Sequence, residues 1–195
     1  MPYNVVPYNV VPYNVVPYNV KISYYAFMAC LLPIYTIHYP LVNFFNLCIV
    51  HLNLVLISFI TDKPIFISMS ALGISIIQLI WLLDFICQTL GLEFLDVTVY
   101  MYNENLPLYL RSLSLFHAWF PFLLFYLVKK VGYDQRAVYP QFILSNGVCL
   151  LSYFHTDLYN QNINRIKDFH IYYHLIFFPI VIFITHKFLL WVVSI

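Results

Sequence analysis

Two histidines near the end of the sequence have the spacing of a metal-binding pair. His170 and His174 stand four residues apart, which on a helix places both imidazoles on one face, where they can chelate a metal ion. We expect His117 and Asp84 at the same outer side of the molecule, so these four residues form a candidate zinc site. The alternative, which we favour, is that histidines near a membrane surface simply lie close to water.

Asp84 and Arg111 are candidates for a buried ion pair. Asp84 is the single charge in the apolar stretch 64–90, and it lies about 7 Å inside a helix that ends at Thr89, since each residue adds 1.5 Å. Arg111 begins the next apolar stretch at a similar depth. An unpaired carboxylate there costs several kcal/mol, which a guanidinium partner offsets. We therefore favour a structural pair that joins two helices over a substrate or proton site.

A helix over about 110–128 is expected to position the chemistry around His117. Arg111, Ser114 and His117 recur every third residue, which places them on one side of that helix. Pro121 lacks the amide that would bond the carbonyl of His117. The sequence therefore predicts a kink that leaves a polar carbonyl beside a polar side chain.

The composition of the chain is that of a protein whose solvent is lipid. Of its 195 residues, 63% are hydrophobic and only 9% are charged, whereas a soluble domain carries about a quarter charged residues. The mean hydropathy is +0.81. The net charge of +1 implies neither a nucleic acid nor an acidic partner. The four cysteines stand apart in apolar stretches and are expected to be small buried hydrophobes: Cys30, Cys48, Cys87 and Cys149.

The apolar stretches predict five or six membrane-spanning helices in an all-α bundle. A span needs about 20 residues, and the candidates are residues 24–39, 41–60, 64–90, 110–128, 137–154 and 171–185. The first is short because Pro33 and Pro40 interrupt the tract, and it crosses the membrane or lies at its surface. The last is expected to end before His186 and Lys187, which can reach the interface. Four polar residues in the second candidate must face protein rather than lipid: Asn43, Asn46, His51 and Asn53.

Residues 2–20 form an uninterrupted PYNVV repeat. A proline at every fifth position excludes a continuous helix, so an extended, poorly ordered segment is expected over 1–20, followed by the helical domain over 21–195. The regularly spaced tyrosines suit an interaction arm. We favour the simpler interpretation, in which expansion of a short DNA repeat produced a segment with no specific role.

The distribution of basic residues predicts the orientation of the bundle. Alternate ends of the expected spans differ in charge, and the more basic end should be cytoplasmic. That end carries Lys21, Lys63, Lys129, Lys130 and Arg136, and the other carries Arg111, Arg165 and Lys167 with Glu93, Asp96 and Glu104.

Several short motifs resemble a group of uncharacterised bacterial polytopic integral membrane proteins. The motifs are WLLDF at 81–85, VYMY at 99–102, PLYLRSLSLFH at 107–117, GYDQRA at 132–137 and NIN at 162–164. The resemblance covers residues 41–187 and implies a multi-pass protein of the bacterial inner membrane. The PYNVV repeat and the HIYYH segment at 170–174 depart from the pattern of that group.

The histidine spacing also bears a partial resemblance to the membrane hydrolase superfamily that includes the ceramidases. That superfamily uses a His-x-x-x-His pair with a further His and Asp on other helices. Here no His-x-x-x-Asp completes the pattern. His186 stands twelve residues after His174 and is rotated by about 120° from it on an ideal helix.

These observations favour a non-enzymatic membrane protein with a structural, assembly or small-solute role. The lipid bilayer is the expected partner, and no nucleotide-binding or nucleophile-elbow motif is present. The alternative is a metal-dependent intramembrane hydrolase or lipid-modifying enzyme with its site at the outer face.

Overall fold

The structure, a computed structural model, describes residues 16–154 and 171–194, with only the backbone described for Tyr153 and residues 171–175. This part of the chain is all-helical, as predicted. The α-helices are α1 (Tyr18–His38), α2 (Leu47–Thr61), α3 (Ile65–Thr89), α4 (Leu108–Ser114), α5 (Phe116–Val131), α6 (Val138–Phe154) and α8 (Ile171–Ser194). Short 3₁₀ segments are η2 (Leu41–Phe45), η3 (Val99–Tyr102) and η4 (Gln135–Ala137).

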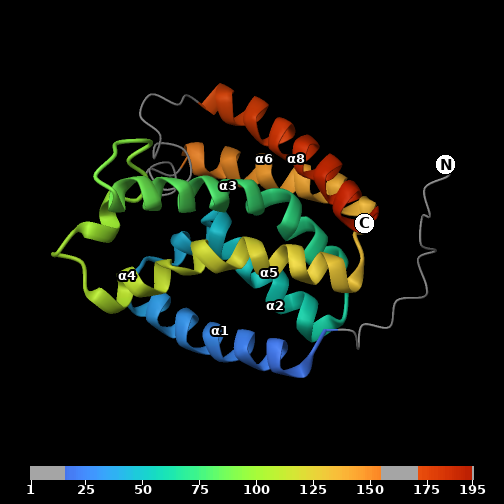
Figure 1. Cartoon of the computed structure of the whole chain (residues 1–195), viewed down its shortest axis with the longest axis horizontal. Helices are drawn as coiled ribbons and strands as arrows, with labels where there is room; N and C mark the ends of the chain where they lie inside the picture. Colours follow the sequence, from blue (N-terminus) through green and yellow to red (C-terminus); the bar gives the residue numbers. More distant parts are fainter. Residues whose placement is uncertain (1–15, 155–170, 195) are drawn as a thin grey trace.

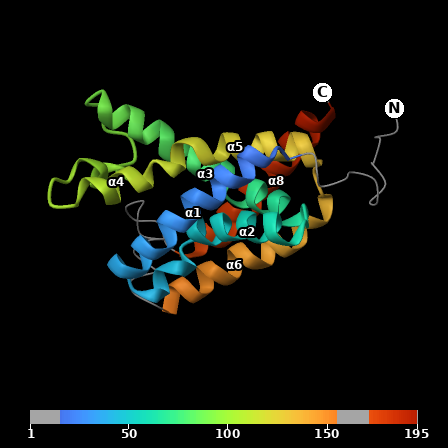
Figure 2. The same cartoon turned by 90° about the horizontal axis from the view of Figure 1, so that it is seen from below.

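Helix α3 is the centre of the bundle. It packs against α2, α5, α6 and α8, while α1 lies at the periphery (Figures 1 and 2). The long helices run side by side, and each runs opposite to the one before it in the chain. We call the end that holds residues 90–107 the loop end, and the end that holds residues 62–64 and 132–134 the turn end. The basic residues that the sequence assigned to one side lie at the turn end.

Four helical stretches in the described residues are long and apolar enough to cross a membrane, which is compatible with a multi-pass protein. They are Tyr18–His38, Ile65–Thr89, Leu108–Val131 and Ile176–Ser194. The predicted five or six spans are therefore not confirmed. Helix α2 is apolar but has only 15 residues, because the first part of the expected span at 41–60 is the 3₁₀ segment η2 and Asn46 then caps α2 by accepting from the Cys48 amide at 3.0 Å.

Helix α1 begins within the segment that carries the PYNVV repeat. Tyr18 begins the helix inside the last repeat unit, directly after Pro17. Proline is common at the start of a helix, because its fixed φ suits the first turn and its missing amide hydrogen is not needed there. Val16 is buried, with 4% of its surface exposed. The predicted interruption at Pro33 is wrong, since α1 runs through it and ends at His38, before Pro40. The rest of the repeat, residues 1–15, lies outside the described residues.

The helix expected over 110–128 is longer than predicted and is broken in two. It starts at Leu108, and the break lies at Leu115, six residues before the kink expected at Pro121. The Ala118 amide bonds the Leu115 carbonyl at 2.9 Å instead of the Ser114 carbonyl that a regular helix would offer it. The Nδ1 of His117 bonds the Ser114 carbonyl instead, at 2.7 Å. The carbonyl that contacts the His117 side chain is therefore that of Ser114. The carbonyl expected there was that of His117 itself, which the missing Pro121 amide leaves unbonded.

Helix α8 continues past the end that the sequence predicted. It extends through His186 and Lys187 to Ser194, since only apolar residues follow the basic pair up to that serine. The phenol oxygen of Tyr133 lies 2.7 Å from Nδ1 of His186, which joins α8 to the connection after α5. Burial, followed by the nearby Asp134 carboxylate, raises the pKa of Tyr133, so the phenol keeps its hydrogen.

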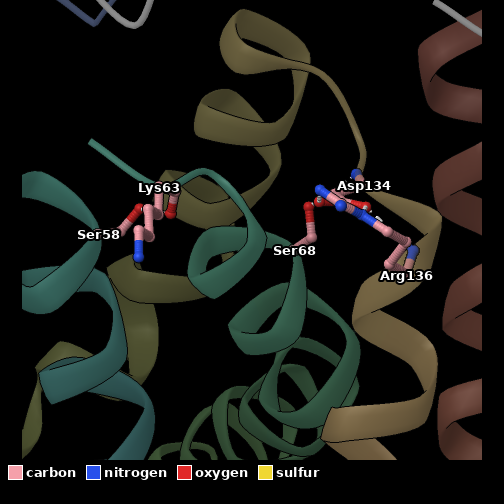
Figure 3. A network of polar contacts seen from close by, with 5 residues as sticks. All are labelled: Ser58, Lys63, Ser68, Asp134 and Arg136. Carbon is pink, nitrogen blue, oxygen red and sulfur yellow. Dashed lines mark hydrogen bonds and ion pairs between the residues drawn. The ribbon is translucent and has the colours of Figure 1, made fainter. Parts of the chain in front are cut away.

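The turn end is fastened by polar contacts between its short connections (Figure 3). Ser58 donates to the Lys63 carbonyl at 2.7 Å, which closes the turn between α2 and α3. Ser68 accepts from the Asp134 amide at 3.0 Å. Arg136 bonds both carboxylate oxygens of Asp134, at 3.1 and 3.0 Å. Burial raises the pKa of Asp134, and the Arg136 amide opposes that shift.

The cysteine prediction is confirmed for one residue only. Cys149 is buried, Cys48 and Cys87 are half-buried, and Cys30 is exposed; all four are free thiols. Cys30 lies on α1, the peripheral helix, on a face that the described residues leave exposed.

Candidate functional site

Asp84 is buried near the loop end and holds the loop that follows α3. Its carboxylate accepts three hydrogen bonds, from the Leu95 amide at 2.7 Å, the Thr98 amide at 2.8 Å and the Thr98 hydroxyl at 2.7 Å. The carboxylate and Thr98 are fully buried. Hydrogen bonds to an ionised acceptor are among the strongest in proteins, so Asp84 stabilises the structure of this loop.

The predicted ion pair between Asp84 and Arg111 is not formed in the described part of the chain. The Arg111 guanidinium instead donates to the Met101 carbonyl at 3.0 Å. Both side chains therefore hold one segment, residues 95–101, through separate hydrogen bonds. Backbone amides and a hydroxyl satisfy the carboxylate, so it needs no guanidinium partner.

His117 is part of an aromatic stack, and nothing in its geometry indicates a metal ligand. Its ring lies 4.8 Å from that of Trp81 and 4.0 Å from that of Phe116, stacked on both. The described residues contain no group of three His, Cys, Asp or Glu side chains that could bind a metal. His170 and the side chain of His174 lie outside the described residues, so the predicted pair stays a prediction.

A second polar cluster lies in the middle of the bundle, where α2, α3 and α6 meet. The Nε2 of Gln141 on α6 lies 3.3 Å from Nε2 of His51 on α2 and 2.7 Å from the Ser145 hydroxyl. On α3, the Ser70 hydroxyl donates to the His51 carbonyl at 3.2 Å. We name the polar core as these four fully buried residues: His51, Ser70, Gln141 and Ser145. Ser75 and Gln78 are also fully buried on α3, and no hydrogen bond among the described residues joins either of them to this group.

Gly73 allows the three helices to approach this closely. A Cβ at position 73 would overlap the Gln141 amide and the His51 imidazole, and it would lie 2.6 Å from Cδ of Gln141. Only glycine leaves room for both side chains against the backbone of α3. The sequence of α3 therefore determines where the side chains of α2 and α6 meet.

Several buried polar atoms of α2, α3 and α6 have no hydrogen-bond partner among the described residues. They are Nδ1 of His51, the Ser75 hydroxyl, both amide atoms of Gln78 and Oε1 of Gln141. Buried polar groups are nearly always hydrogen-bonded, and an unpaired one costs about 1–3 kcal/mol.

The polar core lies at mid-depth. Gly73 lies about 12 Å from the turn end of α3, and Gln78 about 16 Å from its loop end, at 1.5 Å per residue. In a hydrocarbon layer about 30 Å thick, this is the region in which polar groups are most costly.

A groove of about 760 Å³ lies on the surface between α1 and the α4–α5 segment. Its lining is largely apolar and aromatic, and it includes Phe27, Leu108 and Trp119. None of the polar-core residues lines it. The groove is therefore a feature of the outer surface of the bundle and a separate feature from the central cluster.

Sequence reasoning singled out one residue of the polar core, His51, and missed the rest. Of the four polar residues expected to face protein in the second candidate span, Asn43, Asn46 and His51 are buried and Asn53 is half-buried. Gln78, Gln141 and Gly73 were not singled out. A signal did exist, because Gln78 is the only amide side chain in the apolar stretch 64–87, and a polar residue inside a span is a functional candidate by default.

The fold and the polar core define a class: an all-helical bundle with apolar spans around a buried, uncharged polar centre. Comparison with protein families, with curated proteins and with solved structures finds no match. The functional argument therefore depends on the geometry of the chain itself.

Proposed function

We propose that this chain is an integral membrane protein whose polar core handles small polar solutes. The observation that carries the proposal is the set of unpartnered polar atoms at mid-depth on α2, α3 and α6. Polar side chains in a span are costly and usually line substrate or ion pathways. A purely structural cluster would pair its polar groups with one another, whereas the Gln78 amide has no partner in the described residues.

The polar groups along α3 continue from the turn end to the loop end. Ser68, Ser75, Gln78 and Asp84 are all buried on this helix, and Ser68 contacts the turn-end connection through the Asp134 amide. Ser75 and Gln78 are the members of this set that have no partner among the described residues, and they support a role beyond holding the bundle together.

The metal-dependent enzyme is not favoured by any described contact. Asp84 accepts hydrogen bonds from the loop, and His117 bonds the Ser114 carbonyl. We therefore base the proposal on the polar core.

We further propose the bacterial inner membrane as the location, with the turn end in the cytoplasm. The resemblance to bacterial membrane proteins supports the membrane, and the positive-inside rule supports the orientation. The turn end carries most of the described basic residues, whereas the loop end carries Arg111 together with Glu93, Asp96 and Glu104.

Cysteine labelling tests the orientation. In intact cells, an impermeant maleimide should label Glu104→Cys, which is exposed at the loop end, and should leave Lys130→Cys unlabelled until the cells are opened. The parent protein, with its four native cysteines, gives the background. Labelling of Lys130→Cys alone in intact cells would reverse the proposed orientation.

Replacement of Gln78 by leucine separates function from stability. Because the amide has no partner in the described residues, Gln78→Leu should leave the free energy of unfolding unchanged or raise it by up to about 2 kcal/mol. Flux through proteoliposomes should nevertheless fall about tenfold or more, the equivalent of one lost hydrogen bond. The measurements are thermal unfolding in detergent and flux of water, glycerol, protons, K⁺ and Cl⁻.

The matched control is Ile74→Leu, a shape change at a buried apolar position on the same helix, which should keep wild-type flux. The proposed function is wrong if the parent protein moves no member of the panel faster than protein-free vesicles do. It is also wrong if Gln78→Leu is folded and retains full flux.

A further inference from the structure

Two contacts between side chains join α1 to the α4–α5 segment near the two ends of the groove between them. At the loop end, the Tyr109 hydroxyl lies 2.8 Å from Nε2 of His38. Farther into the bundle, the rings of Phe27 and Trp119 meet edge to face, with their centroids 4.9 Å apart. The groove of about 760 Å³ lies on the outside of the bundle, and Leu108 on its wall exposes 70% of its surface.

The length of the groove matches one leaflet of a membrane. Its wall extends from Leu108, the first residue of α4, to Trp119 on α5. This is eleven residues, or about 16 Å along a helix, and half of a hydrocarbon layer about 30 Å thick is about 15 Å. Helix α1 also ends at the loop end (Figure 1). The groove therefore extends from the loop end to about the middle of the membrane.

The chemistry of the lining changes along this length. The described residues that line the groove include no charged side chain. The hydroxyls among them belong to Tyr109 and Ser112 on α4, in the half nearer the loop end. The deeper half is lined by the aromatic rings of Phe27, Phe116 and Trp119. Polar groups at one end and hydrocarbon at the other match the order of groups in a lipid molecule that lies in one leaflet.

The groove is continuous with the surface of the bundle that lipid would cover. Both of its walls belong to helical stretches that are long and apolar enough to cross a membrane, Tyr18–His38 and Leu108–Val131. Each stretch exposes large apolar side chains, such as Ile37 and Phe122. An unfilled groove would deprive its walls of van der Waals contacts on one side, and lipids are the molecules that surround these helices in a bilayer.

We propose that the groove is a lipid-binding site that holds one acyl chain of a phospholipid from the leaflet at the loop end. Tyr109 and Ser112 lie where the ester groups of that lipid would be, and a hydroxyl can donate to an ester oxygen. Inside a bilayer, packing rather than the hydrophobic effect favours such contacts, so the fit between two walls distinguishes this lipid from its neighbours. The inference goes beyond solute handling and rests only on the proposed membrane location.

Ile34→Trp tests the site, because it adds bulk to the wall that α1 contributes. Its matched control is Ile37→Trp, the same change on the same helix at a side chain that is 77% exposed and does not line the groove. Binding of the lipid should fall about tenfold in Ile34→Trp, because the added ring takes the place of the chain, and should be unchanged in Ile37→Trp. If Ile34→Trp fails to fold, Ser112→Trp fills the groove from the opposite wall.

Photolabelling in vesicles of phosphatidylethanolamine and phosphatidylglycerol measures the binding. Phosphatidylglycerol with a diazirine at the end of one acyl chain should label Phe27 and Trp119. The same lipid with the diazirine beside its ester should label Tyr109 and Ser112. Peptide mapping locates the label, and carbonate extraction checks that the parent protein and the variants are inserted in the membrane.

Each other outcome of this experiment has a distinct meaning. Label spread evenly over the outward faces of the described helices, or unchanged in both Ile34→Trp and Ser112→Trp, would show surrounding lipid only and overturn the inference. A cross-link between two copies through Phe27 or Trp119, without lipid label, would assign the groove to a second copy and overturn it as well. Release of the parent protein by carbonate would overturn the proposed membrane location and the inference with it. A lack of solute flux would contradict the proposed function and leave the lipid site standing.

Discussion

Gly73→Ala should destabilise the bundle by about 2–6 kcal/mol. The added Cβ would overlap the Gln141 amide and the His51 imidazole, and both side chains are fully buried. Moving them would break the contacts of Gln141 with His51 and Ser145. The expected cost combines overpacking, about 1–3 kcal/mol, with newly unpaired buried polar groups, about 1–3 kcal/mol. Thermal and denaturant unfolding of the detergent-solubilised protein would measure it.

Gly147→Ala is the matched control for this substitution. Gly147 also lies in a helix, α6, but a Cβ there would contact nothing within 4 Å. This variant should gain about 0.5–1 kcal/mol, because alanine suits a helix interior better than glycine does. Gln141→Ala should also restore part of the stability of Gly73→Ala, since it removes one of the overlapping groups. If the two glycine-to-alanine changes had equal effects on the free energy of unfolding, Gln141 and His51 would not pack closely against Gly73.

Asp84→Ala should have the second large effect, a loss of about 3–5 kcal/mol. It would leave three donors without their acceptor, two of them backbone amides in the loop at 95–98, and unpaired buried donors cost about 1–3 kcal/mol each. The loss should be concentrated in the loop end. Hydrogen exchange and limited proteolysis should therefore show faster exchange and cleavage within residues 91–107, while the centre of α3 stays protected.

Two further variants calibrate the effect of Asp84. Thr98→Val removes only the hydroxyl bond and should cost about 1–2 kcal/mol. Asp96→Asn changes an exposed carboxylate of the same loop, and asparagine tolerates the positive φ of 58° at that position, so its effect should be within about 0.5 kcal/mol. A loop that exchanges at the parent rate in Asp84→Ala would show that the carboxylate does not hold it.

The positions of the helices could be predicted from the sequence, and their limits could not. Apolar stretches separated by polar turns predict helices wherever lipid is the solvent, because every backbone group must then be bonded within its own segment. Ends depend on local contacts that periodicity does not show. Thus α2 starts late because Asn46 caps it, and α8 continues past Lys187.

The partners of the charged residues also could not be predicted. Matching depth favoured a pair between Asp84 and Arg111, and both side chains do lie at the loop end. In the structure each of them bonds the segment at 95–101 instead. A loop of irregular backbone offers amides and carbonyls at positions that no sequence pattern specifies. Such groups bond Asp84 and Arg111 in place of the expected salt bridge.

The sequence by itself determined that this chain is an all-helical protein with apolar spans, because this property follows from composition and from the order of residues along single helices. Only the tertiary structure showed that His51, Gly73 and Gln141, on three different helices, meet at one point. Their separation along the chain carries no information about that contact. It depends on how the helices rotate and slide as they pack, and that is fixed by the fit of all their side chains together.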